Sequence, residues 1–241
     1  VEEDSVVAKM IVNAFSESMG LQNLPVIELR HDEKIVVEKS EPKDLLRQLR
    51  LRKTAVAWSM PDGSLQSELN DRPTGLVSGA FNPLHSGHIA LRTAAEEFLG
   101  SPVFFELPIF NVDKPPLDFL SIDERRRNIA ELPLALTNSA TFAHKARALP
   151  DTVFVVGVDT AFRIVMTKYY LEGRIGLHEA LVQIRDQGCS FLVAGREMQG
   201  RFQTLDDVAI PLEFVDLFQE LPEHVFRVDI SSTDIRHRAS D

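Results

Sequence analysis

The sequence predicts an α/β protein with a Rossmann-like, doubly wound parallel sheet and a small α/β segment before it. From residue 74 onward, apolar runs of strand length alternate with stretches of helical spacing. These runs are too apolar to leave one side in water, which indicates a parallel sheet with helices on both faces. A polar stretch at residues 67–73 precedes this pattern, so we expect one unit at 1–72 and another at 73–241.

The first unit is expected to hold two helices and three short strands. Apolar residues from Val7 to Met19 fall at helical spacing and predict a helix over residues 4–20, ended by Gly20. The remaining expected elements are strands at 25–29 and 34–37, a helix at 42–51 and a strand at 54–60.

The second unit is expected to alternate strands and helices to its end. Gly100 and Gly188 follow apolar helical patterns and act as helix stop signals. Strands are expected at 75–81, 103–110, 140–143, 152–158, 190–194 and 226–230. Helices are expected at 86–99, 122–132, 161–166 and 175–186, with a short one closing the chain. Residues 197–225 show no pattern that assigns them.

Composition excludes several classes of protein. The chain has 26 Lys and Arg against 36 Asp and Glu, a net charge of −10, which argues against a generally basic surface for nucleic acid. No apolar run has the length of a membrane span, and the first residues do not resemble a signal peptide. The single cysteine, Cys189, excludes an internal disulfide and fits a reducing compartment. We therefore expect a cytoplasmic protein without nucleic-acid or membrane partners, and leave a homo-oligomer open.

The strongest chemical signal is the segment Ser-Gly-Ala-Phe-Asn-Pro-Leu-His-Ser-Gly-His at residues 78–88. It joins the first strand of the second unit to a helix, where open α/β sheets bind ligands. His85 and His88 share a face if the turn is helical, and Gly79 and Gly87 allow close backbone approach to a ligand. Free N–H groups at the helix start attract anions, which indicates a phosphate site. The alternatives are two histidines with a structural role and a zinc site, which would need further ligands; we expect no metal bound by protein ligands alone.

This segment resembles the Gly-x-Phe-Asn-Pro-x-His-x-Gly-His signature of the nucleotidylyltransferase superfamily. The superfamily includes the nicotinamide mononucleotide adenylyltransferases, the phosphopantetheine adenylyltransferases and the cytidylyltransferases. Residues 230–236, Ile-Ser-Ser-Thr-Asp-Ile-Arg, resemble a second motif of the same superfamily. Taken alone, this segment is a capped helix start whose hydroxyls, N–H groups and arginine suit a polyphosphate.

Two further segments are read with this resemblance. Gly157-Val158-Asp159-Thr160 resembles the Gly-x-Asp segment that lies against the nucleotide, although a helix cap explains it equally. Lys114 follows a strand, where related enzymes place a basic residue on a phosphate. The run Arg125-Arg126-Arg127 is mainly expected to be a solvated helix face, with one arginine in the cleft as the alternative.

The resemblance implies a set of site residues. Catalytic roles fall to His85, His88, Lys114 and Arg236. Nucleotide-binding roles fall to Gly79, Phe81, Asn82, Gly87, Gly157, Asp159, Thr160, Ser231, Ser232 and Thr233. Many relatives that act on nicotinamide mononucleotide stack an aromatic ring on the pyridine, and here the candidates are Phe162, Tyr169 and Tyr170.

The implied activity is transfer of a nucleoside monophosphate from a nucleoside triphosphate to a phosphorylated acceptor, with release of pyrophosphate. ATP is favoured, nicotinamide or nicotinate mononucleotide is the expected acceptor in NAD biosynthesis, and Mg²⁺ is expected with the triphosphate. The alternatives are a cytidylyltransferase that uses CTP and a nucleotide-binding regulatory module without catalysis. A class I aminoacyl-tRNA synthetase is disfavoured because the chain is short. The first unit weakly resembles the end of a competence-damage-protein amidase domain, whose Ser-x-Thr-Gly-Gly stretch it lacks, so no amidase activity is expected.

Overall fold

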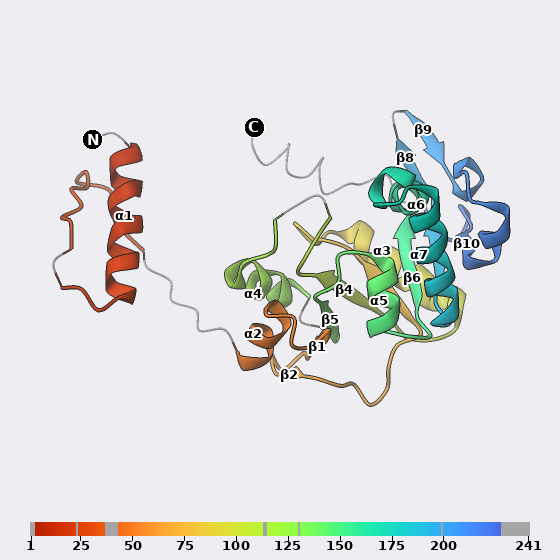
Figure 1. Ribbon diagram of the computed structural model, residues 1–241, viewed down its shortest axis with the longest axis horizontal. Coiled ribbons are helices and arrows are strands. Elements are labelled where there is room, and N and C mark those ends of the chain that lie inside the picture. The colour runs from red at the N-terminus through yellow and green to blue at the C-terminus, as the bar shows by residue number, and fades with distance from the viewer. Residues whose placement is uncertain are drawn as a thin grey trace. The chain divides into compact units, whose positions relative to one another are not determined.

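The computed structural model describes residues 3–22, 24–36, 43–112, 115–129, 131–198 and 200–227 (Figure 1). Contacts within the chain define two compact units, Val1–Ser40 and Glu41–Asp241. This division falls well before the expected boundary at residue 72, because the strand at 56–59 pairs into the main sheet. No helix in the described ranges has the length and apolarity needed to cross a membrane.

In its described residues, the first unit consists of helix α1 (Glu3–Ser18) and a segment without regular secondary structure. The Asn13 side chain donates a hydrogen bond to the Pro25 carbonyl at 2.9 Å and ties the two together. The expected strands at 25–29 and 34–37 are wrong for the described residues 24–36, which lie in no sheet; Val37 lies outside them. Alternating apolar residues form a strand only beside a partner that pairs with their backbone groups.

The second unit is built on an eight-stranded sheet in the order β10-β7-β6-β3-β4-β5-β1-β2. The six strands from β10 to β5 run parallel; at the β5 edge, β1 pairs antiparallel with β5, and β2 pairs antiparallel with β1. The predicted doubly wound α/β fold is therefore confirmed, with an antiparallel edge added. The strands are β1 (Val56–Ser59), β2 (Leu65–Gln66), β3 (Gly75–Ser78), β4 (Val103–Pro108), β5 (Leu134–Thr137), β6 (Val153–Gly157), β7 (Ser190–Ala194) and β10 (Phe218–Leu221).

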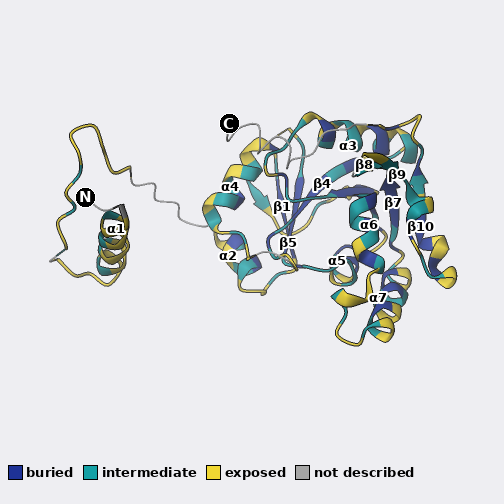
Figure 2. Cartoon of the chain, turned by 90° about the horizontal axis from the view of Figure 1, so that it is seen from above, coloured by how far each residue is buried: buried dark blue, intermediate teal, exposed yellow. Residues whose placement is uncertain are grey.

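Helices cover both faces of this sheet, and the strands between them are the most buried part of the unit (Figure 2). Successive strand residues alternate between two apolar clusters: Leu76 packs with one and Val77 with the other. One face carries α5 (Phe142–Ala148), α6 (Val158–Val165) and α7 (Arg174–Asp186). The other carries α2 (Asp44–Arg50), α3 (Ser86–Leu99) and α4 (Phe119–Asn128).

Two sequence expectations fail between α4 and β6. The helix expected at 122–132 ends at Asn128, and residues 134–137, for which no strand was expected, form β5 between β4 and β1. The strand expected at 140–143 is wrong, because Thr141 caps α5 by accepting a hydrogen bond from the His144 N–H. A four-residue buried strand has too few residues to show a period of its own.

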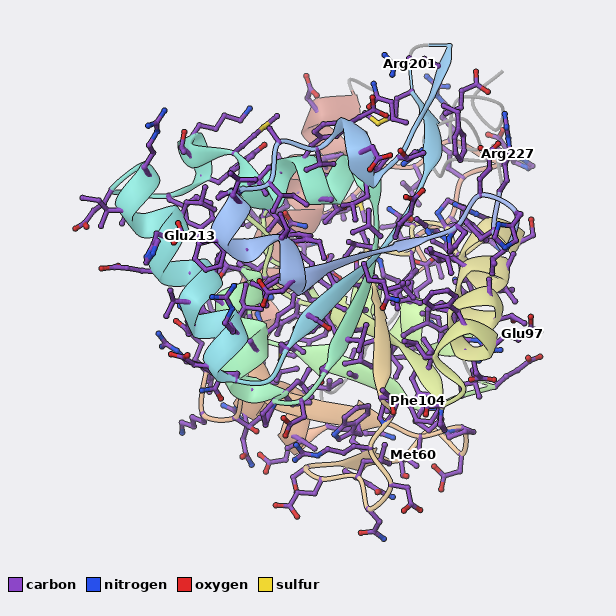
Figure 3. All side chains as sticks on the ribbon, turned by 90° about the vertical axis from the view of Figure 1, so that its right-hand side faces the viewer. Met60, Glu97, Phe104, Arg201, Glu213 and Arg227 are labelled. Carbon is purple, nitrogen blue, oxygen red and sulfur yellow. The ribbon has the colours of Figure 1, made fainter. Side chains whose placement is uncertain are left out.

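Residues 197–225, unassigned from sequence, leave the carboxyl end of β7 and, in their described part, return to pair beside it. They form a hairpin of β8 (Arg196–Met198) and β9 (Arg201–Gln203), the short helices η2 (Leu205–Asp207) and η3 (Leu212–Leu217), and β10. Figure 3 shows Arg201 on this hairpin at one end of the sheet and Phe104, near the start of β4, at the other. Of the strand expected at 226–230, residues 226 and 227 are not in a strand, and the rest lies outside the described residues.

Candidate active site

A cavity of about 700 Å³ opens at the carboxyl ends of β3, β4, β6 and β7. Parallel sheets bind ligands at this edge because their loops and helix N-termini gather there. The structure brings together nine of the expected site residues, which all line this cavity: Gly79, Phe81, Asn82, His85, Gly87, His88, Gly157, Asp159 and Thr160. The expected Lys114, Ser231, Ser232, Thr233 and Arg236 lie outside the described residues.

The loop after β3 is shaped by the buried ring of Phe81. Phe81 has a φ of +47°, an uncommon backbone conformation for a bulky residue, which costs roughly 1–3 kcal/mol and needs support from its surroundings. That support is edge-on packing against Phe105 at 5.0 Å and against His88 at 5.1 Å between ring centroids. A Cβ on Gly79 would lie 2.7 Å from the Phe81 ring, so this position requires glycine. The Phe81 ring thus holds the loop against β4 and supports the His88 ring.

His85 and His88 stack on each other at the start of α3, with ring centroids 3.7 Å apart and 29° between their planes. The His85 backbone N–H points to Nδ1 of His88 at 3.3 Å, so Nδ1 acts as acceptor and the ring proton is assigned to Nε2. Nδ1 of His85 is buried and has no hydrogen-bond partner among the described residues. His88 therefore has an Nε2–H donor for a ligand in the cavity.

Both histidines are held in the neutral form. Burial, together with the neighbouring His85 and Arg196, lowers the pKa of His88 to about 4. Burial and the charge of Arg196 also lower the pKa of His85 below its usual range. At neutral pH the positive charge of the cavity therefore comes from arginines, while the imidazoles supply neutral donors.

Asp159 lies at the start of α6 between two of these arginines. Its carboxylate contacts Arg163 at 3.0 Å and Arg196 at 3.2 Å. A Cβ on Gly157 would come within 2.6 Å of Oδ1 of Asp159, so glycine leaves room for this carboxylate. Gly195, before Arg196, is equally constrained: a Cβ there would lie 2.8 Å from the Phe202 ring.

The arginine run on α4 divides between the cavity and the body of the protein. Arg125 lines the cavity and donates a hydrogen bond to the Ala80 carbonyl at 3.0 Å. Burial lowers the pKa of Arg125, although a guanidinium stays charged in proteins. Arg126 instead bonds Ser59 and pairs with Asp123 at 2.7 Å, with its side chain 8% exposed. One arginine of the three therefore points into the cleft.

Sequence reasoning did not single out Arg163 and Arg196, which line the same cavity. A signal for Arg196 was present: an apolar strand, a glycine and then a charged residue, the same order that marks Asp159. The aromatic candidates for stacking lie elsewhere, because neither Phe162, Tyr169 nor Tyr170 is among the described residues that line the cavity. The Tyr170 hydroxyl donates to the Ile164 carbonyl at 2.6 Å, and burial raises its pKa to about 12.

The carboxylates around the cavity are already engaged by protein groups. Asp159 is paired with arginines, and Asp118 accepts hydrogen bonds from Ser121 at the N-terminus of α4. Within the described ranges, no group of three or more His, Cys, Asp or Glu side chains is placed to hold a metal ion. The residues present fit a cation that arrives on phosphate oxygens, with few protein ligands.

Comparison with known proteins agrees with this geometry. Residues 76–238, about two thirds of the chain, match the Cytidylyltransferase-like family. The chain belongs to this family of nucleotidylyltransferases. Its match includes both histidines, Asp159 and Arg196.

A curated relative points in the same direction. The chain is 30% identical over 163 residues to the "Putative nicotinamide mononucleotide adenylyltransferase" of Schizosaccharomyces pombe. The alignment covers 61% of this chain and 61% of the relative. The chain thus matches less than two thirds of the relative's length.

Proposed function

We propose that this protein transfers a nucleoside monophosphate, with ATP favoured as the donor, to a phosphorylated acceptor such as nicotinamide or nicotinate mononucleotide. Pyrophosphate is the leaving group, and the reaction would serve NAD biosynthesis. The observation that carries the proposal is the stacked, neutral His85–His88 pair in an arginine-lined cavity at the carboxyl edge of the sheet. The name of the relative supports the choice of acceptor.

The proposed chemistry is one in-line displacement without a covalent intermediate. An oxygen of the acceptor phosphate attacks the α-phosphorus, and the bond from that phosphorus to the bridging oxygen of pyrophosphate breaks. Negative charge develops on the phosphoryl oxygens, and fixed donors at that place stabilise it. His88 is suited to this role because its Nδ1 is occupied by the His85 N–H, which leaves Nε2–H to donate.

Arg125, Arg163 and Arg196 would supply the positive charge for the phosphates of both substrates. Lys114, Ser231, Ser232, Thr233 and Arg236 are proposed to add phosphate contacts on the strength of their motifs. Asp159 is proposed to accept a hydrogen bond from a ribose hydroxyl. Mg²⁺ bound to the triphosphate would neutralise part of its charge.

The experiment below also tests two alternative functions. A cytidylyltransferase would use the same histidine and arginine machinery with CTP, and the family includes such enzymes. A regulatory module would bind nucleotide without turnover. We also propose a cytoplasmic location, because the single cysteine, Cys189, fits a reducing compartment.

The decisive experiment is pyrophosphate release in the presence of Mg²⁺, with ATP and CTP each crossed with nicotinamide mononucleotide, nicotinate mononucleotide, phosphopantetheine and phosphocholine. The His85→Ala/His88→Ala variant serves as the blank. Release that depends on the histidines with ATP and either pyridine mononucleotide would support the proposal. Release only with CTP would favour the cytidylyltransferase. Absence of release with every pair, alongside a nucleotide-dependent rise in melting temperature, would favour the regulatory module.

A further inference from the structure

A buried ion pair lies behind the cavity, where the proposed reaction does not use it. Glu106 on β4 is 0% exposed and Lys145 on α5 is 4% exposed, with Nζ 2.7 Å from Oε2. Neither side chain lines the cavity. Burying two charges costs several kcal/mol each, and an apolar pair of similar volume often gives equal or greater stability. Stability alone is therefore a weak reason for this pair.

The carboxylate of Glu106 joins the ends of three neighbouring strands. The Ser78 hydroxyl, at the end of β3, donates to Oε2, and the Thr137 hydroxyl, at the end of β5, donates to Oε1. Lys145 completes the cluster with a hydrogen bond to Ser78 Oγ at 3.0 Å, and its Nζ lies 4.6 Å from the centre of the Phe142 ring. The four side chains, Ser78, Glu106, Thr137 and Lys145, form what we call the strand-end cluster.

The cluster reaches the cavity through Ser78. This residue lines the cavity and stands directly before Gly79, whose backbone N–H donates to the Glu106 carbonyl at 3.1 Å. The bond from the Ser78 hydroxyl to the Glu106 carboxylate and the bond from the Gly79 N–H to the Glu106 carbonyl fix the point where the chain leaves the sheet. The loop that carries His85 and His88 begins at this point. A shift at this point moves the histidines relative to groups held by the other strands.

We propose that the strand-end cluster is a positioning element that acts through Ser78 to place the His85–His88 loop against the rest of the cavity. This inference rests on the proposed nucleotidyl transfer. The hydrogen bonds of the Glu106 carboxylate do the positioning. Lys145 offsets the free-energy cost of burying the negative charge of that carboxylate. Loss of these hydrogen bonds is expected to lower turnover, because displacement of catalytic groups by about 1 Å costs on the order of 100-fold in rate.

Two double variants separate positioning from stability. In Glu106→Met/Lys145→Met, the charges leave together and an apolar pair of similar volume fills the space, so no unpaired charge is left behind. The unfolding midpoint should fall only modestly, because the buried Thr137 hydroxyl loses its acceptor, while kcat falls by about 100-fold. Glu106→Gln/Lys145→Met also removes both charges but keeps two hydrogen bonds: the amide oxygen accepts from the Thr137 hydroxyl, and the amide NH2 donates to Ser78 Oγ, which Lys145 no longer occupies. It should keep kcat close to wild type. Arg185→Met/Asp216→Met, which removes an exposed ion pair between α7 and η3, is the control.

A readout in the ligand-free protein keeps this inference distinct from the proposed reaction. The pKa of His88, followed by NMR, should rise from about 4 toward 6.5 in Glu106→Met/Lys145→Met, because a displaced loop admits water to the ring. Absence of pyrophosphate release from the wild type would defeat the proposed function and leave this readout intact. If Glu106→Met/Lys145→Met does not fold, Ser78→Ala, which leaves the ion pair in place, should give the same rise. Wild-type kcat and wild-type His88 titration in the variant tested would overturn the inference.

Discussion

His88 should make the stability of the protein depend on pH, and His88→Ala should reduce that dependence. The pKa of His88 is about 4 in the folded protein and near 6.5 in the unfolded chain. The unfolded chain therefore binds the proton first as the pH falls. The contribution of His88 to the free energy of unfolding is full above pH 6.5 and falls as the pH drops toward 4. With 1.36 kcal/mol for each pKa unit, and some allowance for partial solvent contact, the loss is about 2–3 kcal/mol.

The assay is urea unfolding of wild type and variant at several pH values between 7.5 and 4.5. The quantity compared is the change in the free energy of unfolding with pH, since removal of the imidazole also leaves a small cavity that lowers stability at every pH. His178→Ala is a matched control because the His178 side chain is 52% exposed, with Glu213 at 3.4 Å and the Phe214 ring at 5.3 Å as surface neighbours. If His88→Ala loses stability on acidification as steeply as wild type, the reasoning on His88 is refuted. An NMR titration of His88 near pH 6.5 would refute it equally.

Three further changes probe the cavity. Arg196→Met should weaken the binding of inorganic tripolyphosphate, measured by calorimetry. It should also raise the pKa of His85 and of His88, since the charge of Arg196 lowers both pKa values. Unchanged binding and titration would show that Arg196 is not part of the phosphate site. Asp159→Asn should reduce the preference for ATP over 2′- and 3′-deoxy-ATP by about tenfold, the effect of one charge-assisted hydrogen bond. An undiminished preference would show that Asp159 does not bind a ribose hydroxyl. Gly195→Ala should lower the free energy of unfolding by about 1–3 kcal/mol, because its Cβ meets Phe202 at 2.8 Å and a backbone oxygen at 2.9 Å; urea unfolding at wild-type concentration would contradict this.

The sequence was most informative where local chemistry sets the structure. The helix expected at 86–99 is found at Ser86–Leu99, and the strand expected at 190–194 at Ser190–Ala194. Both segments have a full apolar pattern and clear end signals. The end signal of the helix is Gly100, which adopts the left-handed conformation. The nine described motif residues lie together because they follow parallel strands, whose carboxyl ends meet at one edge.

Sequence reasoning failed where a segment depends on its neighbours. β5 has only four residues, and it is a strand because β4 and β1 pair with it on either side. The expected strand at 75–81 ends at Ser78, since Phe81 turns back to pack against Phe105 and His88. No pattern in a single segment contains either contact.

The sequence by itself determined the α/β class, the family of the chain and the loop with its two histidines, because short motifs and apolar periodicity are local properties. Only the tertiary structure decided that these histidines are neutral, that Arg125, Arg163 and Arg196 share their cavity, and that Glu106 joins three strand ends behind it. Each of these properties arises from groups far apart in the chain. Burial and charge act through space, and only the folded chain fixes the distances over which they act.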